Sequence, residues 1–496
     1  MEMGIAMRTA GRIAVGLLGL MVVVAGVVAV RTATFRAPAA FDPESIALAD
    51  APPLDTRTAA RHLAEAVRFR TISHQDAAEN DWTEWSRFHA WLEATYPAAH
   101  VAMNREIVAG HTLVYTWPGR DARRPPIVLP AHHDVVPVTP GSETDWRHPP
   151  FEGVIADEAI WGRGSVDDKG SLVALFEAVE ALLATGFQPG RTVIIVSGHD
   201  EEAGGSGALA AADLLKSRGV VAEFVLDEGL AVVADYPLLG RPVALVGIAE
   251  KGYGTLRITA PAKGGHSSAP PPATGVEVLA SAVLAITGNP FPMRFEGPAA
   301  EMLRTLAPEA GLGARAAIAN SWLFAPLLVR QIAATPAGAA GLHTTIAPTM
   351  LRGSPKENVL PQDAAAWINY RISPGHSSAA VLDHARRATD GLDVTIEWER
   401  PPYEPAPVSS ASSAGYRIIA ALASEGGSLP VAPGLVTAYT DSRSFTAVAT
   451  DIYRFQPIVA SMREFEMIHG TNEHLTFDNL ERMTGFYARL IASAAQ

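Results

Sequence analysis

Short polar strings in this chain carry the residue types that bind metals and move protons. His132 and Asp134 are two residues apart at the end of an apolar run, so on an extended chain they share a face. His132 can then bind a metal while Asp134 accepts the other imidazole N–H and fixes the tautomer. A His-x-Asp pair alone does not establish a site, because a histidine is more often an ordinary polar residue.

Two further strings are rich in acids. Residues 162–170 precede a predicted helix, where a carboxylate such as Asp167 also gains from the helix dipole, so helix capping is an alternative role. Asp200, Glu201 and Glu202 follow one another at another predicted strand end. Like charges this close repel unless a cation compensates them, which favours a metal site over a solvated charge run.

The last acidic strand end and a late histidine complete the set. Asp227 and Glu228 end a third apolar run, and His469 opens the string of residues 469–473. Together the strings offer His, Asp, Glu, Asp and His without a thiolate, because the chain has no cysteine. Such a set suits a two-zinc hydrolase with one bridging carboxylate.

The composition excludes several other classes of protein. The 496 residues include 39 Lys+Arg and 52 Asp+Glu, which gives a formal charge of −13, whereas nucleic-acid binding needs a basic surface. With 48% hydrophobic and 18% charged residues the chain can build more than one core, so a long disordered chain is excluded. The absence of cysteine excludes disulfides, thiolate zinc sites and cysteine nucleophiles.

An uninterrupted apolar stretch of residues 13–30 lies between Arg12 and Arg31. As a helix it would be about 27 Å long, near the hydrocarbon thickness of a bilayer. It predicts an uncleaved single-pass anchor that leaves the catalytic part exported, in a periplasm, a lumen or outside the cell. The alternative is a signal peptide cleaved near residues 37–39, which would give a secreted form.

The elements that must position the polar strings are strands that alternate with helices from about residue 57. Predicted strands at residues 127–129, 193–196 and 224–226 each run into one of the strings. Alternation of this kind predicts an α/β fold with a mostly parallel mixed sheet, whose ligands gather beyond the carboxyl ends of the strands.

A second unit is predicted inside the first. From residue 253 the order becomes β-α-β-β-α-β, which indicates an inserted ferredoxin-like domain. The expected division is a membrane anchor and flank (1–40), a catalytic domain in two parts (41–252 and 403–496) and a lid and dimerisation domain (253–402). Residues 290–343 are expected to be a helical insertion that either shapes a substrate entrance or extends the smaller core.

The strings resemble the zinc peptidase family called M20. The likeness is carried, in the family's order and spacing, by residues 131–137, 162–170, 198–202, 264–267 and 469–473, and it extends from about residue 57 to the end. It is closest to the carboxypeptidase S branch, which includes vacuolar Gly-X carboxypeptidase and the secreted N-fatty-acyl amino acid synthase/hydrolase.

The resemblance implies a role for each candidate ligand. His132 would bind one zinc ion with Asp227, Glu202 and His469 would bind the second, and Asp167 would bridge the two.

The resemblance also implies which residues transfer protons and stabilise charge around the zinc ions. Asp134 would orient His132, and Glu201 would be the general base that moves a proton from water to the leaving nitrogen. The bond between Asp167 and Asp168 is expected to be cis. His266 resembles a histidine that crosses a dimer interface to stabilise the oxyanion, and its alternative role is a polar loop residue.

Three residues are candidates for substrate binding. Arg371 resembles the lid arginine that grips the free carboxylate of the substrate, a task suited to a planar bidentate donor. Asn358 resembles a lid asparagine near the same site. Arg443 either meets the substrate or the lid, or forms an ordinary salt bridge.

These implications predict a membrane-anchored dizinc hydrolase that cleaves the amide bond to a C-terminal amino acid with a free carboxylate in small peptides. The alternative is an N-acyl amino acid hydrolase or synthase that accepts a fatty acyl chain. A catalytically inactive, membrane-tethered binding protein would need a lost ligand or base, and none is missing. The expected partners are the substrate, the membrane and a second copy of the chain, bound through the lid domain.

Overall fold

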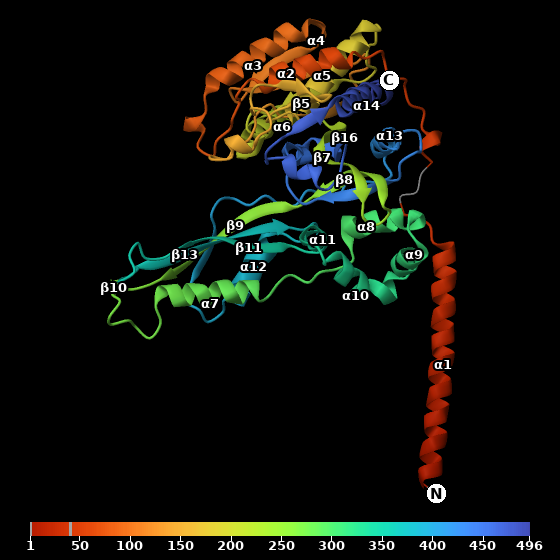
Figure 1. The fold of residues 1–496 in the computed structure, drawn as a ribbon, viewed down its shortest axis with the longest axis vertical. Helices are drawn as coiled ribbons and strands as arrows, with labels where there is room; N and C mark the ends of the chain where they lie inside the picture. The colour runs from red at the N-terminus through yellow and green to blue at the C-terminus, as the bar shows by residue number, and fades with distance from the viewer. Residues whose placement is uncertain (1, 39–41) are drawn as a thin grey trace.

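The computed structural model describes residues 2–38 and 42–496 of the chain. The expected domain boundary between residues 40 and 41, and Ala39 of the possible cleavage site, lie outside the described residues. Figure 1 shows a larger upper layer, a smaller lower layer and a helix that projects away from both.

A mixed eight-stranded sheet forms the centre of the larger layer, in the order β1-β2-β6-β3-β7-β16-β8-β15. Its central strands β6, β3, β7 and β16 run parallel to one another. Every residue of β3 and β6 is buried, as expected of strands covered on both faces, whereas β7 and β16 also carry charged residues. The strands are β1 (Asn104–Val108), β2 (Thr112–Trp117), β3 (Ile127–Pro130), β6 (Val193–Ser197), β7 (Ala222–Tyr236), β8 (Arg241–Glu250), β15 (Val431–Val436) and β16 (Ala449–Ala460).

Helices cover both faces of this sheet. One face carries most of the core, and the other is covered by α6, whose alanines and Leu215 pack on Val128 and Ile194. In α5 the apolar residues recur at the predicted helical spacing, and the helix stops just before Gly186, which has a positive φ of 78°. The helices are α2 (Thr56–Val67), α3 (Trp82–Thr95), α4 (Pro97–Ala102), α5 (Lys169–Ala184), α6 (Ser206–Ser217), α13 (Ala414–Ala423) and α14 (Phe477–Ala494).

A small antiparallel sheet, in the order β17-β5-β4, joins two parts of the chain that are far apart in sequence. Trp161 at the end of β5 pairs with His474 at the start of β17. The polar strings that follow β5 and precede β17 are therefore held side by side. The strands are β4 (Val154–Ala156), β5 (Ala159–Trp161) and β17 (His474–Thr476).

The smaller layer is built on an antiparallel four-stranded sheet in the order β11-β13-β9-β14. Residues of α7 and α12 pack on one face of this sheet and form a separate core. A capping box between Thr274 and Glu277 fixes the start of α7. The elements are β9 (Gly252–Pro261), α7 (Gly275–Thr287), β11 (Thr345–Arg352), β13 (Asp363–Ile372), α12 (Ser378–Ala388) and β14 (Thr395–Trp398), with a short ladder of β10 (Gly265–His266) and β12 (Val359–Leu360).

The predicted insertion at residues 290–343 is helical, and it belongs to neither sheet alone. Leu306 of α8 packs on Val233, Val243 and Leu245 of the larger sheet, whereas Ile318 and Leu328 belong to a small core within the insertion. The insertion therefore does more than extend the core of the smaller layer. Its helices are α8 (Gly297–Leu306), α9 (Leu312–Ala319), α10 (Ser321–Ile332) and α11 (Pro336–Leu342).

The N-terminal helix α1 (Glu2–Thr34) contains a candidate membrane span at Arg12–Thr34, by length and apolar composition. A signal sequence near the N-terminus meets the same criteria. Figure 1 shows α1 passing beside α9 and projecting below the smaller layer.

Candidate metal centre and active site

Parallel strands bring the polar strings to one edge of the larger sheet. Pro130 at the end of β3 pairs with Val196 of β6, and β7 is the other neighbour of β3. The residues that follow these strands therefore meet beyond the carboxyl end of the sheet, as the alternating pattern predicts.

His132 lies at the centre of the cluster and is buried. Its Nε2 atom is 3.0 Å from Asp167 Oδ1 and 3.5 Å from Glu228 Oε1. Its Nδ1 atom is 3.3 Å from Asp134 Oδ1 and 3.1 Å from the backbone oxygen of Asp134. One ring nitrogen thus faces an orienting acid while the other faces the acids of the cluster, which is the arrangement that a metal-binding histidine needs.

Asp134 also holds the acidic turn after β6. Its carboxylate accepts hydrogen bonds from the backbone N–H of Glu201 at 3.1 Å and of Glu202 at 3.2 Å. The Ser73 hydroxyl donates to the same carboxylate at 2.5 Å. One buried acid therefore fixes both the ring of His132 and the positions of Glu201 and Glu202.

Asp167 lies between the two histidines. Its Oδ1 atom faces His132, and its Oδ2 atom is 3.0 Å from His469 Nε2. His469 Nε2 is also 3.0 Å from Glu202 Oε1. The bond between Asp167 and Asp168 is cis, as the resemblance implied. Asp167 thus has the geometry of a carboxylate that could share its two oxygens between two cations.

A buried ion pair holds the loops of Asp167 and His469 together. Arg163 Nη1 donates to Glu473 Oε2 at 2.7 Å, and Arg163 Nη2 donates to the Gly470 oxygen at 2.8 Å. The other oxygen of Glu473 accepts the backbone N–H groups of Val166 and Asp167. Both residues lie within the strings recognised in the sequence, but their pairing across about 300 residues had no sequence signal.

The strand β7 presents Glu228 to the cluster instead of Asp227. The strand does not end at these acids as expected but continues to Tyr236. Its pairing with β16 shifts between Asp227 and Leu230, so residues 228–229 form a bulge in which Gly229 has a positive φ of 140°. A bulge redirects a side chain, and Glu228 consequently points at His132.

The carboxylate of Asp227 is occupied elsewhere. Its Oδ1 atom accepts the Glu228 N–H at 3.0 Å and its Oδ2 atom accepts the Ser442 N–H at 2.7 Å. This position differs from the ligand role expected for Asp227. A glycine directly after two acids in an apolar strand was the available signal for a bulge and hence for Glu228.

The pKa values in the cluster reflect crowded negative charge. Burial raises the pKa of Glu201 well above its usual range, and burial beside Asp167 raises the pKa of Glu228 to about 8. Hydrogen bonds with Asp167 and Glu202 raise the pKa of His469 to about 10. Carboxylates that resist ionisation and a histidine that retains its proton both indicate a place that favours added positive charge.

The donor atoms are close enough together for metal binding. Ligand atoms of His132, Asp167 and Glu202 lie within 4.8 Å of one another, and so do those of His132, Asp168 and Glu228. Imidazole and carboxylate donors without thiolates suit a catalytic zinc centre that keeps a position open. The described residues therefore fit such a metal.

Two arginines approach the centre from different layers. The guanidinium of Arg371, on β13, lies 4.8 Å from the ring of Tyr253 and 5.5 Å from that of Tyr439. The guanidinium of Arg443 lies 4.1 Å from the ring of Tyr439. Within residues 2–38 and 42–496 neither arginine has an acidic partner within 4.0 Å, so the ordinary salt bridge considered for Arg443 is not found. Arg371 Nη1 is buried without a hydrogen-bond partner.

His266 and Asn358 lie together but away from the acids. His266 pairs with Val359, the neighbour of Asn358, in the β10–β12 ladder, and both side chains are exposed. Figure 1 shows β10 at the outer end of the smaller layer. Within this single chain the structure does not bring these two residues to the metal candidates.

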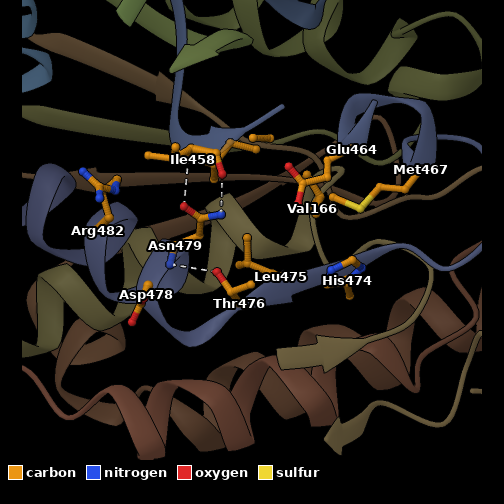
Figure 2. A pocket seen from close by; sticks show the side chains of 12 residues that line it. Val166, Ile458, Glu464, Met467, His474, Leu475, Thr476, Asp478, Asn479 and Arg482 are labelled. Atoms are coloured by element: carbon orange, nitrogen blue, oxygen red, sulfur yellow. Dashed lines mark hydrogen bonds between the residues drawn. The ribbon is translucent and has the colours of Figure 1, made fainter. Parts of the chain in front are cut away.

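A pocket beside the cluster is lined by different residues. Figure 2 shows it between β16, β17 and the start of α14, where Asn479 exchanges hydrogen bonds with the backbone of Val459. Val166 and Met467 line it, but no metal-ligand candidate does. The pocket thus adjoins the loops that carry Asp167 and His469 without being lined by either residue.

An acid-and-histidine centre without thiolates, at the carboxyl edge of an α/β sheet, is typical of metal-dependent hydrolases. The model of the family described as "Peptidase family M20/M25/M40" matches residues 128–493. The chain belongs to this family, which confirms the resemblance, and it is accordingly a metallopeptidase.

Named relatives support this family assignment. The chain is 37% identical over 445 residues to "Probable carboxypeptidase S-like 2" of Dictyostelium discoideum, covering 87% of this chain and 84% of that protein. It is 36% identical over 440 residues to the N-fatty-acyl-amino acid synthase/hydrolase PM20D1 of Xenopus tropicalis, covering 87% and 85%. The solved structure of the M20 family metallo-carboxypeptidase Sso-CP2 from Sulfolobus solfataricus shares the fold, with a TM-score of 0.63, 17% identity and coverage of 87% and 98%.

Replacing Arg163 by Met should lower the free energy of unfolding by about 3–5 kcal/mol, because Glu473 would be left buried and unpaired. Urea unfolding of the full chain in detergent micelles measures this. Arg147→Met is the matched control, since its pair with Asp157 is exposed by 58% and 60% and should contribute at most about 1 kcal/mol. Equal unfolding midpoints for the two variants would contradict the role given to the buried pair.

Proposed function

We propose that the chain is a dizinc hydrolase that cleaves the amide bond to a C-terminal amino acid with a free carboxylate. The observation that carries this proposal is the meeting of His132, Asp167, Glu202 and His469 within hydrogen-bonding distance, with Glu201 on the same turn. Small peptides are the main substrate class.

His132 and Glu228 would hold one zinc ion, His469 and Glu202 would hold the other, and Asp167 would bridge them. Glu228 replaces Asp227 in the ligand set, because the Asp227 carboxylate accepts two backbone hydrogen bonds. Zinc held by these residues would supply Lewis-acid chemistry, by polarising the scissile carbonyl and lowering the pKa of water so that hydroxide is available near neutral pH.

Glu201 is the proposed general base. It is buried, and its raised pKa suits a group that takes a proton from water and then delivers it to the leaving nitrogen. Asp134 fixes the Glu201 backbone and therefore keeps this carboxylate in place.

Arg371 and Arg443 would bind the free carboxylate of the substrate. Both guanidiniums stack on Tyr439, and Glu201 is near enough to influence the pKa of Tyr439. An anion held there would lie beside the base. Because Arg371 belongs to the smaller layer, binding of the carboxylate would draw the two layers together, which gives residues 253–402 the role of a lid.

His266 and Asn358 fit this proposal through a second copy of the chain. They lie at the exposed outer end of the smaller layer, where a homodimer formed through that layer would bring them to the partner's centre. His266 would then stabilise the oxyanion across the interface.

An N-acyl amino acid is the second candidate substrate. It carries the same free carboxylate and amide bond, and the relative from Xenopus tropicalis is named for hydrolysing and making such compounds. The helical insertion α8–α11 exposes apolar side chains such as Leu312 and Trp322, which would offer surface for an acyl chain. The N-terminal span would keep the enzyme at a membrane, exported as a single-pass protein.

The choice between Asp227 and Glu228 as the zinc ligand is testable by metal content. Glu228→Gln should reduce retained zinc from about two ions per chain toward about one, since it removes a ligand. Asp227→Asn should retain both, because that carboxylate faces Ser442. Elemental analysis after dialysis measures this, and the opposite ranking would restore Asp227 as the ligand.

Glu201→Gln should keep zinc and the fold but lower kcat by about 10²- to 10⁴-fold, because the proton acceptor is lost. The adjacent variant Glu202→Gln should instead lose zinc. Steady-state hydrolysis combined with elemental analysis distinguishes the two. A fully active Glu201→Gln enzyme would rule out the proposed mechanism.

Arg371→Met should lower kcat/KM by about 10- to 100-fold for both Gly-Leu and N-oleoyl-leucine, because each presents the free carboxylate to the same charge-assisted contact. The effect should lie mainly in KM, and Arg371→Lys should restore part of it. The matched control is Arg257→Met, an arginine of the same sheet that stacks on Trp367. The ratio of kcat/KM for the two compounds in the parent enzyme ranks the two substrate classes.

A further inference from the structure

The helices α9 and α10 expose several apolar side chains, here called the α9–α10 face, namely Leu312, Trp322, Leu323, Pro326 and Leu327. The exposed fractions are 76% for Leu312, 56% for Trp322, 42% for Leu323 and 47% for Leu327. Four of these five residues follow one another at helical spacing along one side of α10. Soluble proteins rarely expose such a stripe, which marks a site of contact with a membrane or with another apolar surface.

This face is joined to the candidate membrane span. The side chain of Asn320, between α9 and α10, donates to the Val28 oxygen at 3.3 Å and to the Thr32 hydroxyl at 3.1 Å. Arg31 donates to the Ala319 oxygen at 3.4 Å. The end of α1 is therefore fixed to the start of α10.

The contact sets the depth of α10 relative to a bilayer. Val28 lies inside the apolar stretch of residues 13–30, about 3 Å below its end at Val30, given the helical rise per residue. Figure 1 shows α10 at the lower edge of the insertion, on the side toward which α1 projects. A bilayer that covers the apolar part of α1 consequently reaches the α9–α10 face.

The charge of the segment also suits a lipid surface. No Asp or Glu occurs between residues 310 and 356, although the chain has 52 in 496 residues. Arg315 and Arg330 are the basic residues of α9 and α10. Exposed tryptophan, leucine and arginine without acids are typical of helices in the interfacial layer of a membrane.

We propose that the α9–α10 face lies in the interfacial layer of the same membrane that α1 crosses. The two helices have 8 and 12 residues and meet at 119°, so each is too short to cross a bilayer alone. The protein is thus anchored in the membrane at two places, by the span α1 and by the helix pair α9–α10. These two contacts fix the orientation of both layers above the bilayer.

The absence of cysteine allows a direct test with single fluorescent labels. Full-length chains carrying Leu323→Cys or Leu327→Cys would be labelled with an environment-sensitive nitrobenzoxadiazole dye in vesicles of phosphatidylcholine and phosphatidylglycerol. Leu20→Cys in α1 is the reference for the span. Val101→Cys is the matched control, because Val101 is 90% exposed on α4, at the opposite end of the molecule in Figure 1.

The expected result is that nitroxide-labelled lipids quench the dye at Leu323 and Leu327, and that aqueous iodide quenches it several-fold less than at Val101. Iodide quenching equal to that at Val101, without quenching by the lipids, overturns the proposal, whatever Leu20 shows. A second copy of the chain could instead cover the face. In that case the lipids would not quench the dye, and its protection from iodide would disappear when the protein is diluted in the bilayer. This result would also overturn the proposal.

Discussion

Repulsion between buried carboxylates is the constraint on which the rest of this structure depends. At one edge of the sheet Asp167 faces both histidines, Glu228 faces His132 and Glu202 faces His469. Neighbouring acids are neutralised locally: Asp134 accepts two backbone N–H groups, and Glu473 pairs with Arg163. Among residues 2–38 and 42–496 the ion-pair partners of the central acids are His132 and His469, so bound cations would complete the balance of charge and add to the stability of the fold.

The amino-acid sequence was sufficient for those parts of the centre that follow local rules. The apolar runs before His132 and Glu201 read as buried strands, and parallel neighbours must end at one edge, so these residues could be placed together without coordinates. The helical spacing of α5 likewise located Asp167 at its start.

The parts of the centre that could not be predicted depend on the pairing of strands that are far apart in the sequence. Glu228 points at His132 only because β7 bulges against β16, a strand that comes more than 200 residues later in the chain. The same holds for Arg163 and Glu473, whose contact depends on the pairing of β5 with β17. Local periodicity carries no information about such partners, and the expected ligand role of Asp227 came from the family resemblance instead.

The position of β16 has a consequence for when the enzyme can act. β16 lies between β7 and β8 in the sheet, and Gln456 on it donates to the Val166 oxygen beside Asp167. His469 and α14, which ends at Ala494, come later still. The large sheet therefore cannot close, and the centre cannot gain its second histidine, until these late segments pair with the much earlier β7 and Asp167. The centre is consequently assembled by non-local contacts, which form slowly compared with the local contacts within the helices.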